Sequence, residues 1–392
     1  MAENMNMREI KLATFLNFIR EQIEDEDYTP VMGIGKSGIG KTEGVAELCK
    51  EMGIGFCELR LVTMTEVDLL GVPMVGKTEG GESYTDWASN KLLPIASRDG
   101  ERGILVLDEI TSATSTIRAA AYQLLDSKRS LGNYKLPDHW LVVAIGNGIE
   151  DGGVYQGMEG AFINRCKAFR VVEDFETWKT WAIAHDANPS VIAFLQFKPD
   201  ELHKFDPNAD VEMFPSPRAW MSLSRMLNRR EAKRGGVAID KESAGLYACS
   251  AVGVKSGAQF EDFYGYNKNV ASVDDILDGK ISASECNFDT QAFYILEQQV
   301  VRKLGAIYKE HIDQDEGTMD KRAVEVTLNI QKFLMGIPRL DNTLLMLRDL
   351  TANVPEFLNS MLEPEVSNSP VGQQFYANIV QKNSTLFNGG RR

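Results

Sequence analysis

Short apolar runs alternate with helical repeats along the first half of the chain. Residues 29–34, 104–107 and 141–145 are mostly consecutive apolar residues, typical of strands buried on both faces of a parallel sheet. From Val45 to Met52 the apolar residues instead recur at helical spacing, and Gly53 follows them as a stop signal. Strands that alternate with helices predict an α/β fold with a parallel sheet flanked by helices.

The second half of the chain has helical periodicity. Apolar residues keep helical spacing from Phe175 onward, and a long helical repeat runs from Phe293 to Ile307. Prolines end helices, so four of them are expected to separate three or four short helices near the C-terminal end. These prolines are Pro338, Pro355, Pro364 and Pro370. The stretch 235–279 is rich in Gly, Ala, Ser and Asp and has no readable period.

The periodicity divides the chain into three predicted regions. We expect an α/β core over residues 1–175, a helical domain over 176–308 and a helical C-terminal extension over 309–392. A length of 392 residues is more than one hydrophobic core normally holds, so two or three domains are expected.

Composition narrows the classes of function. The chain carries 56 acidic and 42 basic residues, a formal net charge of −14, whereas a protein that tracks nucleic acid normally has a basic surface. No apolar stretch approaches the roughly 18 residues of a membrane span, and the opening MAENMNMREIK has no apolar signal segment. The five cysteines stand singly, without metal-ligand spacing. We therefore expect a soluble, cytoplasmic protein that does not bind a membrane, and the acidic balance disfavours nucleic acid as a partner without excluding a local basic groove.

The segment GIGKSGIGKTEG, residues 33–44, contains the pattern G-x-x-x-x-G-K-[ST] of a phosphate-binding loop. Backbone N–H groups converge on a polyphosphate only where several residues adopt positive φ, which glycine does without strain. Lys41 then supplies a charge to the phosphates and Thr42 a hydroxyl to Mg²⁺, at the N-terminus of a predicted helix. The residues expected to contact ATP here are Gly35, Lys36, Ser37, Gly38, Ile39, Gly40, Lys41, Thr42 and Glu43.

Hydrolysis also requires a carboxylate for the metal and a base for water, and ILVLDE at residues 104–109 supplies both. Asp108 is expected to hold Mg²⁺ together with Thr42, and Glu109 to polarise the attacking water. An ordinary buried strand with a solvated acidic end would have the same sequence pattern. The presence of a phosphate-binding loop in the same chain favours the catalytic interpretation. Asn147, after the next apolar strand, is placed to sense the terminal phosphate or orient the water.

Two turn-rich stretches predict β-hairpins. The arms 72–75 and 83–87 flank a glycine-rich turn, so an inserted hairpin is expected near residues 72–87. Tyr84 and Trp87 either contact a substrate or pack the hairpin onto its own domain. A second short hairpin is expected around 130–135.

The motifs in their order resemble an AAA+ ATPase of the MoxR group over roughly residues 1–300. They are GKSGIGKT (35–42), VDLLG (67–71), ILVLDE (104–109), LPDHWLVVAIGN (136–147), INRC (163–166) and SPRAW (216–220). The resemblance implies that Asn147 is the sensor-one residue, Arg165 the arginine finger and Arg218 the sensor-two arginine of a helical lid. The family usually reads Asp-Arg-Phe around the finger, whereas this chain has Asn164 and Cys166.

The resemblance also implies an assembly and a function. It implies a homo-hexameric ring, in which ATP hydrolysis drives chaperone-like remodelling of a protein substrate, and a partner with a von Willebrand factor A domain. A nucleic-acid motor or the NTPase subunit of a restriction-like defence complex would carry the same core, although the acidic balance disfavours it. A nucleotide-gated scaffold with negligible hydrolysis is a third alternative, against which the Asp108–Glu109 pair speaks.

Overall fold

The computed structural model describes residues 7–88, 91–148, 163–205, 213–313 and 318–380, apart from the side chains of Asp86 and Val380. The chain forms two compact units. The first comprises Met1–Thr177, Phe205–Asp210 and Ser216–Arg218, and the second comprises Trp178–Lys204, Val211–Pro215 and Ala219–Arg392.

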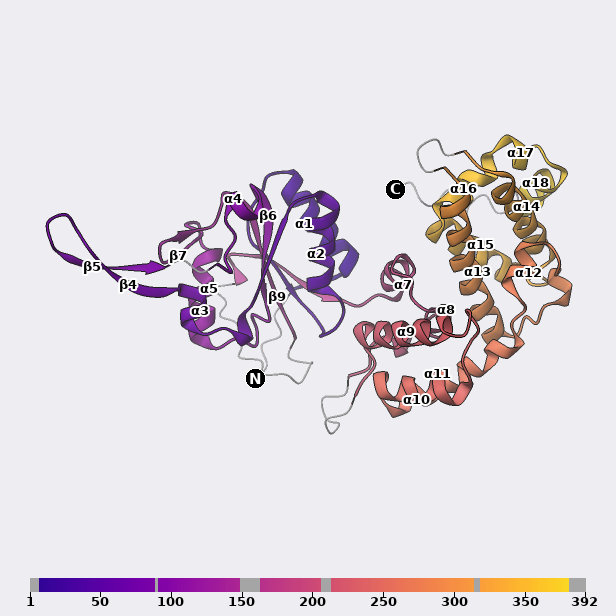
Figure 1. Ribbon diagram of the computed structural model, residues 1–392, viewed down its shortest axis with the longest axis horizontal. Helices are drawn as coiled ribbons and strands as arrows, with labels where there is room; N and C mark the ends of the chain where they lie inside the picture. Colours follow the sequence, from indigo (N-terminus) through magenta and orange to yellow (C-terminus); the bar gives the residue numbers. More distant parts are fainter. Residues whose placement is uncertain (1–6, 89–90, 149–162, 206–212, 314–317, 381–392) are drawn as a thin grey trace. The chain divides into compact units, whose positions relative to one another are not determined.

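A six-stranded sheet forms the centre of the first unit (Figure 1). In spatial order its strands are β1 (Arg8–Lys11), β10 (Lys167–Val172), β2 (Val31–Ile34), β9 (His139–Gly146), β6 (Arg102–Asp108) and β3 (Gly55–Arg60). Every neighbouring pair is parallel, so all carboxyl ends meet at one edge of the sheet. This sheet and the helices described below confirm the predicted α/β fold class.

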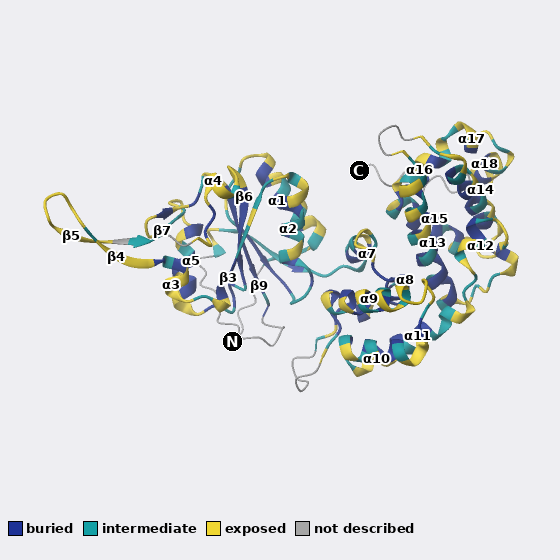
Figure 2. Ribbon diagram, viewed as in Figure 1, coloured by how far each residue is buried: buried dark blue, intermediate teal, exposed yellow. Residues whose placement is uncertain are grey.

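Helices cover both faces of the sheet because its apolar strands present side chains to both. On β6, Ile104 and Val106 pack toward α1 (Leu12–Glu24) and α2 (Lys41–Met52). Leu105 and Leu107 pack on the opposite face, with the apolar side chains of α3 (Glu66–Leu70) and α5 (Ser115–Leu125). Figure 2 shows the central strands in the colour of buried residues. Shorter helical elements among the described residues of this unit include η1 (Leu61–Thr63) and α4 (Ala96–Asp99).

Two antiparallel hairpins complete the first unit. The hairpin expected near residues 72–87 is formed by β4 (Val72–Lys77) and β5 (Ser83–Ala88), and it extends away from the sheet (Figure 1). The shorter hairpin expected around 130–135 is formed by β7 (Ser130–Leu131) and β8 (Tyr134–Lys135).

The second unit is helical, as the periodicity predicts. Its α-helices are α7 (Phe175–Ala184) and α9 (Pro217–Ala232), which both start in the first unit, and α8 (Pro189–Phe197), α10 (Lys241–Val252), α11 (Val254–Tyr264), α12 (Val273–Leu277), α13 (Thr290–His311), α14 (Lys321–Gly336), α15 (Leu340–Asn353), α16 (Pro355–Leu362), α17 (Pro364–Ser367) and α18 (Pro370–Phe375). Shorter turns are η3 (Pro199–Glu201), η4 (Gly265–Asn269), η5 (Ala283–Glu285) and the π-helical η6 (Tyr376–Val380). Helix α13 continues through residue 308, where the sequence places the boundary between lid and extension, so that division stays a prediction. No helix among the described residues is long and apolar enough to cross a membrane.

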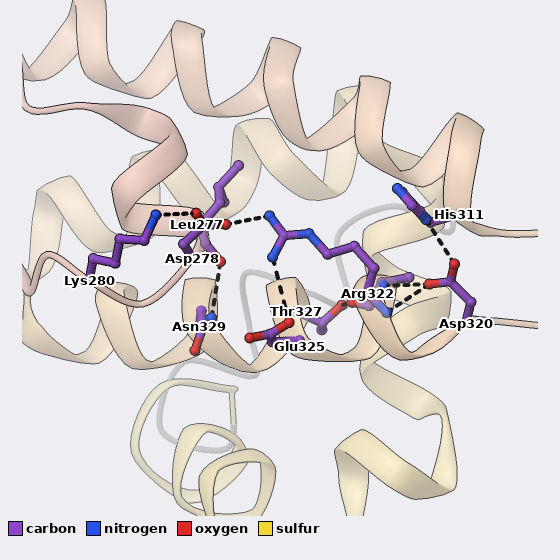
Figure 3. Close-up of polar contacts among 10 residues, drawn as sticks. Leu277, Asp278, Lys280, His311, Asp320, Arg322, Glu325, Thr327 and Asn329 are labelled. Atoms are coloured by element: carbon purple, nitrogen blue, oxygen red, sulfur yellow. Dashed lines mark hydrogen bonds and ion pairs between the residues drawn. The ribbon is translucent and has the colours of Figure 1, made fainter.

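Surface charges link α14 to the elements beside it (Figure 3). Arg322 on α14 forms an ion pair with Asp278, which also pairs with Lys280. Asp320 accepts hydrogen bonds from the first-turn N–H groups of Arg322 and Ala323 and so caps α14. These contacts are at least partly exposed, so each ion pair contributes at most about 1 kcal/mol.

A buried polar cluster lies inside the second unit, where α7, α8, α13 and α15 contribute one side chain or more. Lys179 forms an ion pair with Asp349, and both are at most 3 % exposed. Gln298 donates a hydrogen bond of 3.1 Å to Asp349, and Gln196 donates one of 3.0 Å to Glu297. Burial, with the neighbouring Asp349 carboxylate, raises the pKa of Glu297 well above its ordinary value. The cluster therefore holds a lysine–aspartate pair beside a carboxyl group that retains its proton more readily.

Candidate nucleotide-binding site

The glycine-rich loop joins the buried strand β2 to α2, as a phosphate-binding loop requires. Gly38 and Gly40 have φ of 77° and 93°, in the left-handed region that glycine adopts without strain. At Gly35 a Cβ atom would lie 2.0 Å from the carbonyl oxygen of Val171 on β10. The loop can therefore form in this conformation only with glycine at these positions.

The side chain of Lys41 lies inside the loop. This lysine is only 5 % exposed, and its Nζ donates hydrogen bonds of 2.7 Å to the carbonyl oxygens of Gly35 and Lys36. The Oδ1 atom of Asn147 lies 3.5 Å from the same Nζ. A buried ammonium group at the N-terminus of α2 gives the loop a concentrated positive charge, which suits a phosphate.

Asp108 and Glu109 lie at the carboxyl end of β6, as the sequence predicts. Asp108 is 8 % exposed, and its Oδ1 accepts a hydrogen bond of 2.9 Å from the backbone N–H of Glu109. Glu109 has φ of 55°, a left-handed conformation that costs a non-glycine residue about 1 kcal/mol or more. The next residue, Ile110, donates its N–H to Ile145 on β9, which holds this turn in place. The fold thus maintains a strained backbone at the residue expected to activate water.

Asn147 follows β9, and two contacts fix its backbone beside the loop. Its N–H donates a hydrogen bond of 3.0 Å to Oγ1 of Thr111, which lies in the turn after Glu109. The carbonyl oxygen of Gly146 accepts a hydrogen bond of 3.2 Å from the N–H of Gly35. The structure therefore brings Asn147, the acidic pair and the loop together at one edge of the sheet. Sequence reasoning did not single out Thr111.

Arg218 also belongs to the first unit and contacts the loop. Its backbone N–H lies 3.3 Å from the carbonyl oxygen of Gly38, and Ser216 lies where a Cβ on Gly38 would contact it. The Nη2 atom donates a hydrogen bond of 3.0 Å to Oε1 of Glu43, in the first turn of α2. A residue nearly 180 positions from the loop is thus placed beside it, and its role as a sensor-two arginine stays a prediction.

Lys36 connects the loop to the end of β10, a contact that sequence reasoning missed. Its Nζ forms an ion pair of 2.5 Å with Glu173, and Asp174 pairs with Lys11 at 2.8 Å. Hydrogen bonds from Lys11 and Thr177 outweigh burial and lower the pKa of Asp174. An acidic pair directly after a strand, at the edge where the loop lies, was a signal available in the sequence.

Arg165 lies at the opposite edge of the sheet. It is exposed and precedes β10, whose Lys167 is aligned with Val31 and whose Arg170 is aligned with Ile34, just before the loop. At about 3.3 Å per residue, the five residues from 165 to 170 separate the two edges by roughly 15 Å. Arg165 therefore does not join the site of its own chain. The next residue, Cys166, has a pKa raised to about 12 by burial.

The residues present at this edge of the sheet fit a nucleoside triphosphate with Mg²⁺. The glycine positions leave backbone space that a Cβ would fill, and Lys41 and the N-terminus of α2 supply positive charge. Mg²⁺ in such sites takes one or two protein ligands and completes its shell with phosphate oxygens and waters. Thr42 and Asp108 match that requirement, whereas the described residues contain no cluster of three His, Cys, Asp or Glu side chains that would hold a metal alone.

The two aromatic candidates on the long hairpin differ in their surroundings. Tyr84 is 48 % exposed, although one side of its ring lies over Gly76 of the paired strand. Trp87 lies near Gly132 in the β7–β8 turn, where a Cβ would approach the indole ring to 3.9 Å. Trp87 thus packs within the first unit, and Tyr84 remains accessible.

The solved structures named below are distant from this chain in sequence. No protein-family model matches the chain, and no curated protein matches it significantly. The solved structures to which it is similar include, at 13–16 % identity, Hsp104 with ATPγS and FITC-casein (TM-score 0.35), NtrX from Brucella abortus with ADP (0.33), and a protein from Cytophaga hutchinsonii provisionally described as an ATPase (0.27). The matches cover 57, 64 and 62 % of this chain and 44, 61 and 87 % of those chains, respectively.

Proposed function

We propose that this chain is a Mg²⁺-dependent ATPase of the AAA+ type, similar to the MoxR group, that acts in the cytoplasm. The observation that carries the proposal is the arrangement at the carboxyl edge of the sheet. Lys41 lies in a glycine loop, its Nζ 3.5 Å from Asn147, and the acidic pair ends a strand of the same sheet. The same edge of the sheet therefore carries both the groups that bind phosphate and the carboxylate that activates water.

Each residue has a defined role in this proposal. Lys41 and the loop N–H groups bind the phosphates, and Thr42 and Asp108 hold the metal. Mg²⁺, when bound, supplies charge that offsets the charge developing on the phosphate oxygens. Glu109 accepts a proton from the attacking water, and Asn147 orients that water.

The position of Arg165 supports a shared site. Because Arg165 lies roughly 15 Å from the loop edge along β10, its charge serves a neighbouring copy rather than its own site. A contact between different surfaces of two copies is head-to-tail, and repetition of such a contact closes into a ring or continues as a filament. We propose a ring, with six copies as the resemblance implies.

The ring is proposed to apply the energy of hydrolysis to a protein substrate in a chaperone-like remodelling reaction. The accessible Tyr84 on the long hairpin is the candidate contact for that substrate. A partner with a von Willebrand factor A domain remains part of the proposal through the resemblance alone.

Mixing two inactive variants tests the shared site. Arg165→Ala chains keep their own Glu109 but donate no arginine, whereas Glu109→Gln chains donate the arginine without an active site of their own. At equal mixing, about a quarter of the interfaces combine both intact groups, so we expect recovery toward that fraction of wild-type ATPase activity. Lys41→Ala mixed with Glu109→Gln is the control and recovers nothing, because both defects lie in the same half-site. Absence of recovery at every ratio contradicts a shared site.

A further inference from the structure

The ion pair between Arg218 and Glu43 lies beside the loop that would hold the phosphates. The two side chains are 3.0 Å apart and are 65 % and 56 % exposed. Arg218 is anchored through its backbone to Gly38, so its position near the loop does not depend on the ion pair alone. Its side chain therefore contacts the Glu43 carboxylate and starts from a backbone position beside the loop that would hold the phosphates.

Glu43 places a carboxylate beside the proposed phosphate site. It follows Lys41 and Thr42 in the first turn of α2, at the helix end that attracts anions. A carboxylate there interacts favourably with the helix dipole, but it repels a bound triphosphate. Among the other loop cations, Lys36 is paired with Glu173 and Lys41 is bonded to loop carbonyls. Glu43 instead forms its ion pair with Arg218.

We propose that Glu43 is a specificity-determining residue, which competes with the terminal phosphate of ATP for Arg218 and so lowers the preference of the site for ATP over ADP. The inference rests on the proposed nucleotide site. ADP lacks the terminal phosphate and does not draw Arg218 away from Glu43. Competition for Arg218 therefore weakens the binding of ATP more than that of ADP.

The test is calorimetric titration of the full chain with ATPγS and with ADP, each with Mg²⁺. Glu43→Gln is expected to raise the ratio of ATPγS to ADP affinity about two- to fivefold, the range typical of an exposed ion pair. In an Arg218→Gln background the same substitution is expected to leave that ratio unchanged. A purely structural role at the helix N-terminus would lower stability and would not move the ratio.

Glu51→Gln is the matched control. Glu51 lies on the same helix, is also 56 % exposed and also pairs with an arginine, Arg20, but the described contacts do not connect it to Arg218. We expect Glu51→Gln to leave the affinity ratio unchanged. An unchanged ratio in Glu43→Gln, or the same increase in the Arg218→Gln background, overturns the proposal. If the wild-type chain binds neither nucleotide, the proposed function itself fails.

Discussion

Glu109→Gln is expected to bind ATP with wild-type affinity and to hydrolyse it at least about a hundredfold more slowly. The amide keeps the shape of the side chain but cannot accept a proton from water. Binding is expected to persist because the phosphates are held by the loop, where Lys41 and the glycines lie, and not by Glu109. Steady-state phosphate release and equilibrium nucleotide titration on the same preparation measure the two effects separately.

Lys41→Ala is the comparison variant for this experiment. It removes the ammonium group that is buried in the loop and is expected to abolish nucleotide binding as well as turnover. The two variants therefore differ in the affinity measurement and agree in the turnover measurement. Turnover near the wild-type rate in Glu109→Gln would remove Glu109 from its role as the base.

Lys179→Met is expected to lower the free energy of unfolding of the helical unit by about 3–5 kcal/mol. The substitution leaves Asp349 buried without its lysine, beside the Glu297 carboxyl group, with a hydrogen bond from Gln298 and an ion pair to the largely exposed Arg348. A buried carboxylate that loses its cation must either remain uncompensated or take up a proton. Urea unfolding of the full chain, followed by intrinsic tryptophan fluorescence, to which Trp178 and Trp181 on the same helix contribute, measures the loss.

A double variant separates the ion pair from packing. Lys179→Met combined with Asp349→Leu removes both charges, and it is expected to be more stable than Lys179→Met alone because no charge is left buried. Equal losses in the single and the double variant, or a single-variant loss below about 1 kcal/mol, would contradict the account of this cluster.

The same cluster has a pH dependence with a defined sign. The pKa of Glu297 is higher in the folded chain than in the unfolded chain. The stabilisation that protonated Glu297 gives the folded state is therefore fully present below the pKa of the unfolded chain, and it is lost as the pH rises through the pKa of the folded chain. Glu297→Gln, which does not titrate, provides the reference: it lacks this decrease in stability with rising pH.

Local patterns were sufficient to predict the sheet and the loop. The buried stretches 31–34 of β2, 104–107 of β6 and 141–145 of β9 are apolar because both faces are buried, and that composition is visible without a structure. The prolines near the C-terminal end were equally informative, since Pro355, Pro364 and Pro370 each begin a helix.

The helices in residues 235–279 could not be predicted, because the small residues there serve close packing. Helices α10 and α11 are joined at Gly253, which has φ of 83°. A Cβ at Gly257 would lie 2.5 Å from the backbone nitrogen of Cys249, so the two helices approach only with glycine at that position. The small residues in this stretch resemble those of a linker, but here they allow α10 and α11 to pack closely against each other.

Long-range pairings in the site were also beyond sequence reasoning. Motifs identified Lys41, Asp108, Glu109 and Asn147, but they carry no information about what each neighbouring charge contacts. The ion pair between Lys36 and Glu173 joins residues 137 positions apart, and only the parallel pairing of β2 with β10 brings them together. The Arg218–Glu43 pair depends likewise on the return of the chain to the loop.

The most direct test of the account measures the specific ATPase activity of the wild-type chain against its concentration, with the particle mass determined in the same solutions. If each site requires Arg165 from an adjacent copy, specific activity should rise as rings form and should fall toward zero on dilution to single chains. A strictly monomeric solution that hydrolyses ATP at the full rate would contradict the account.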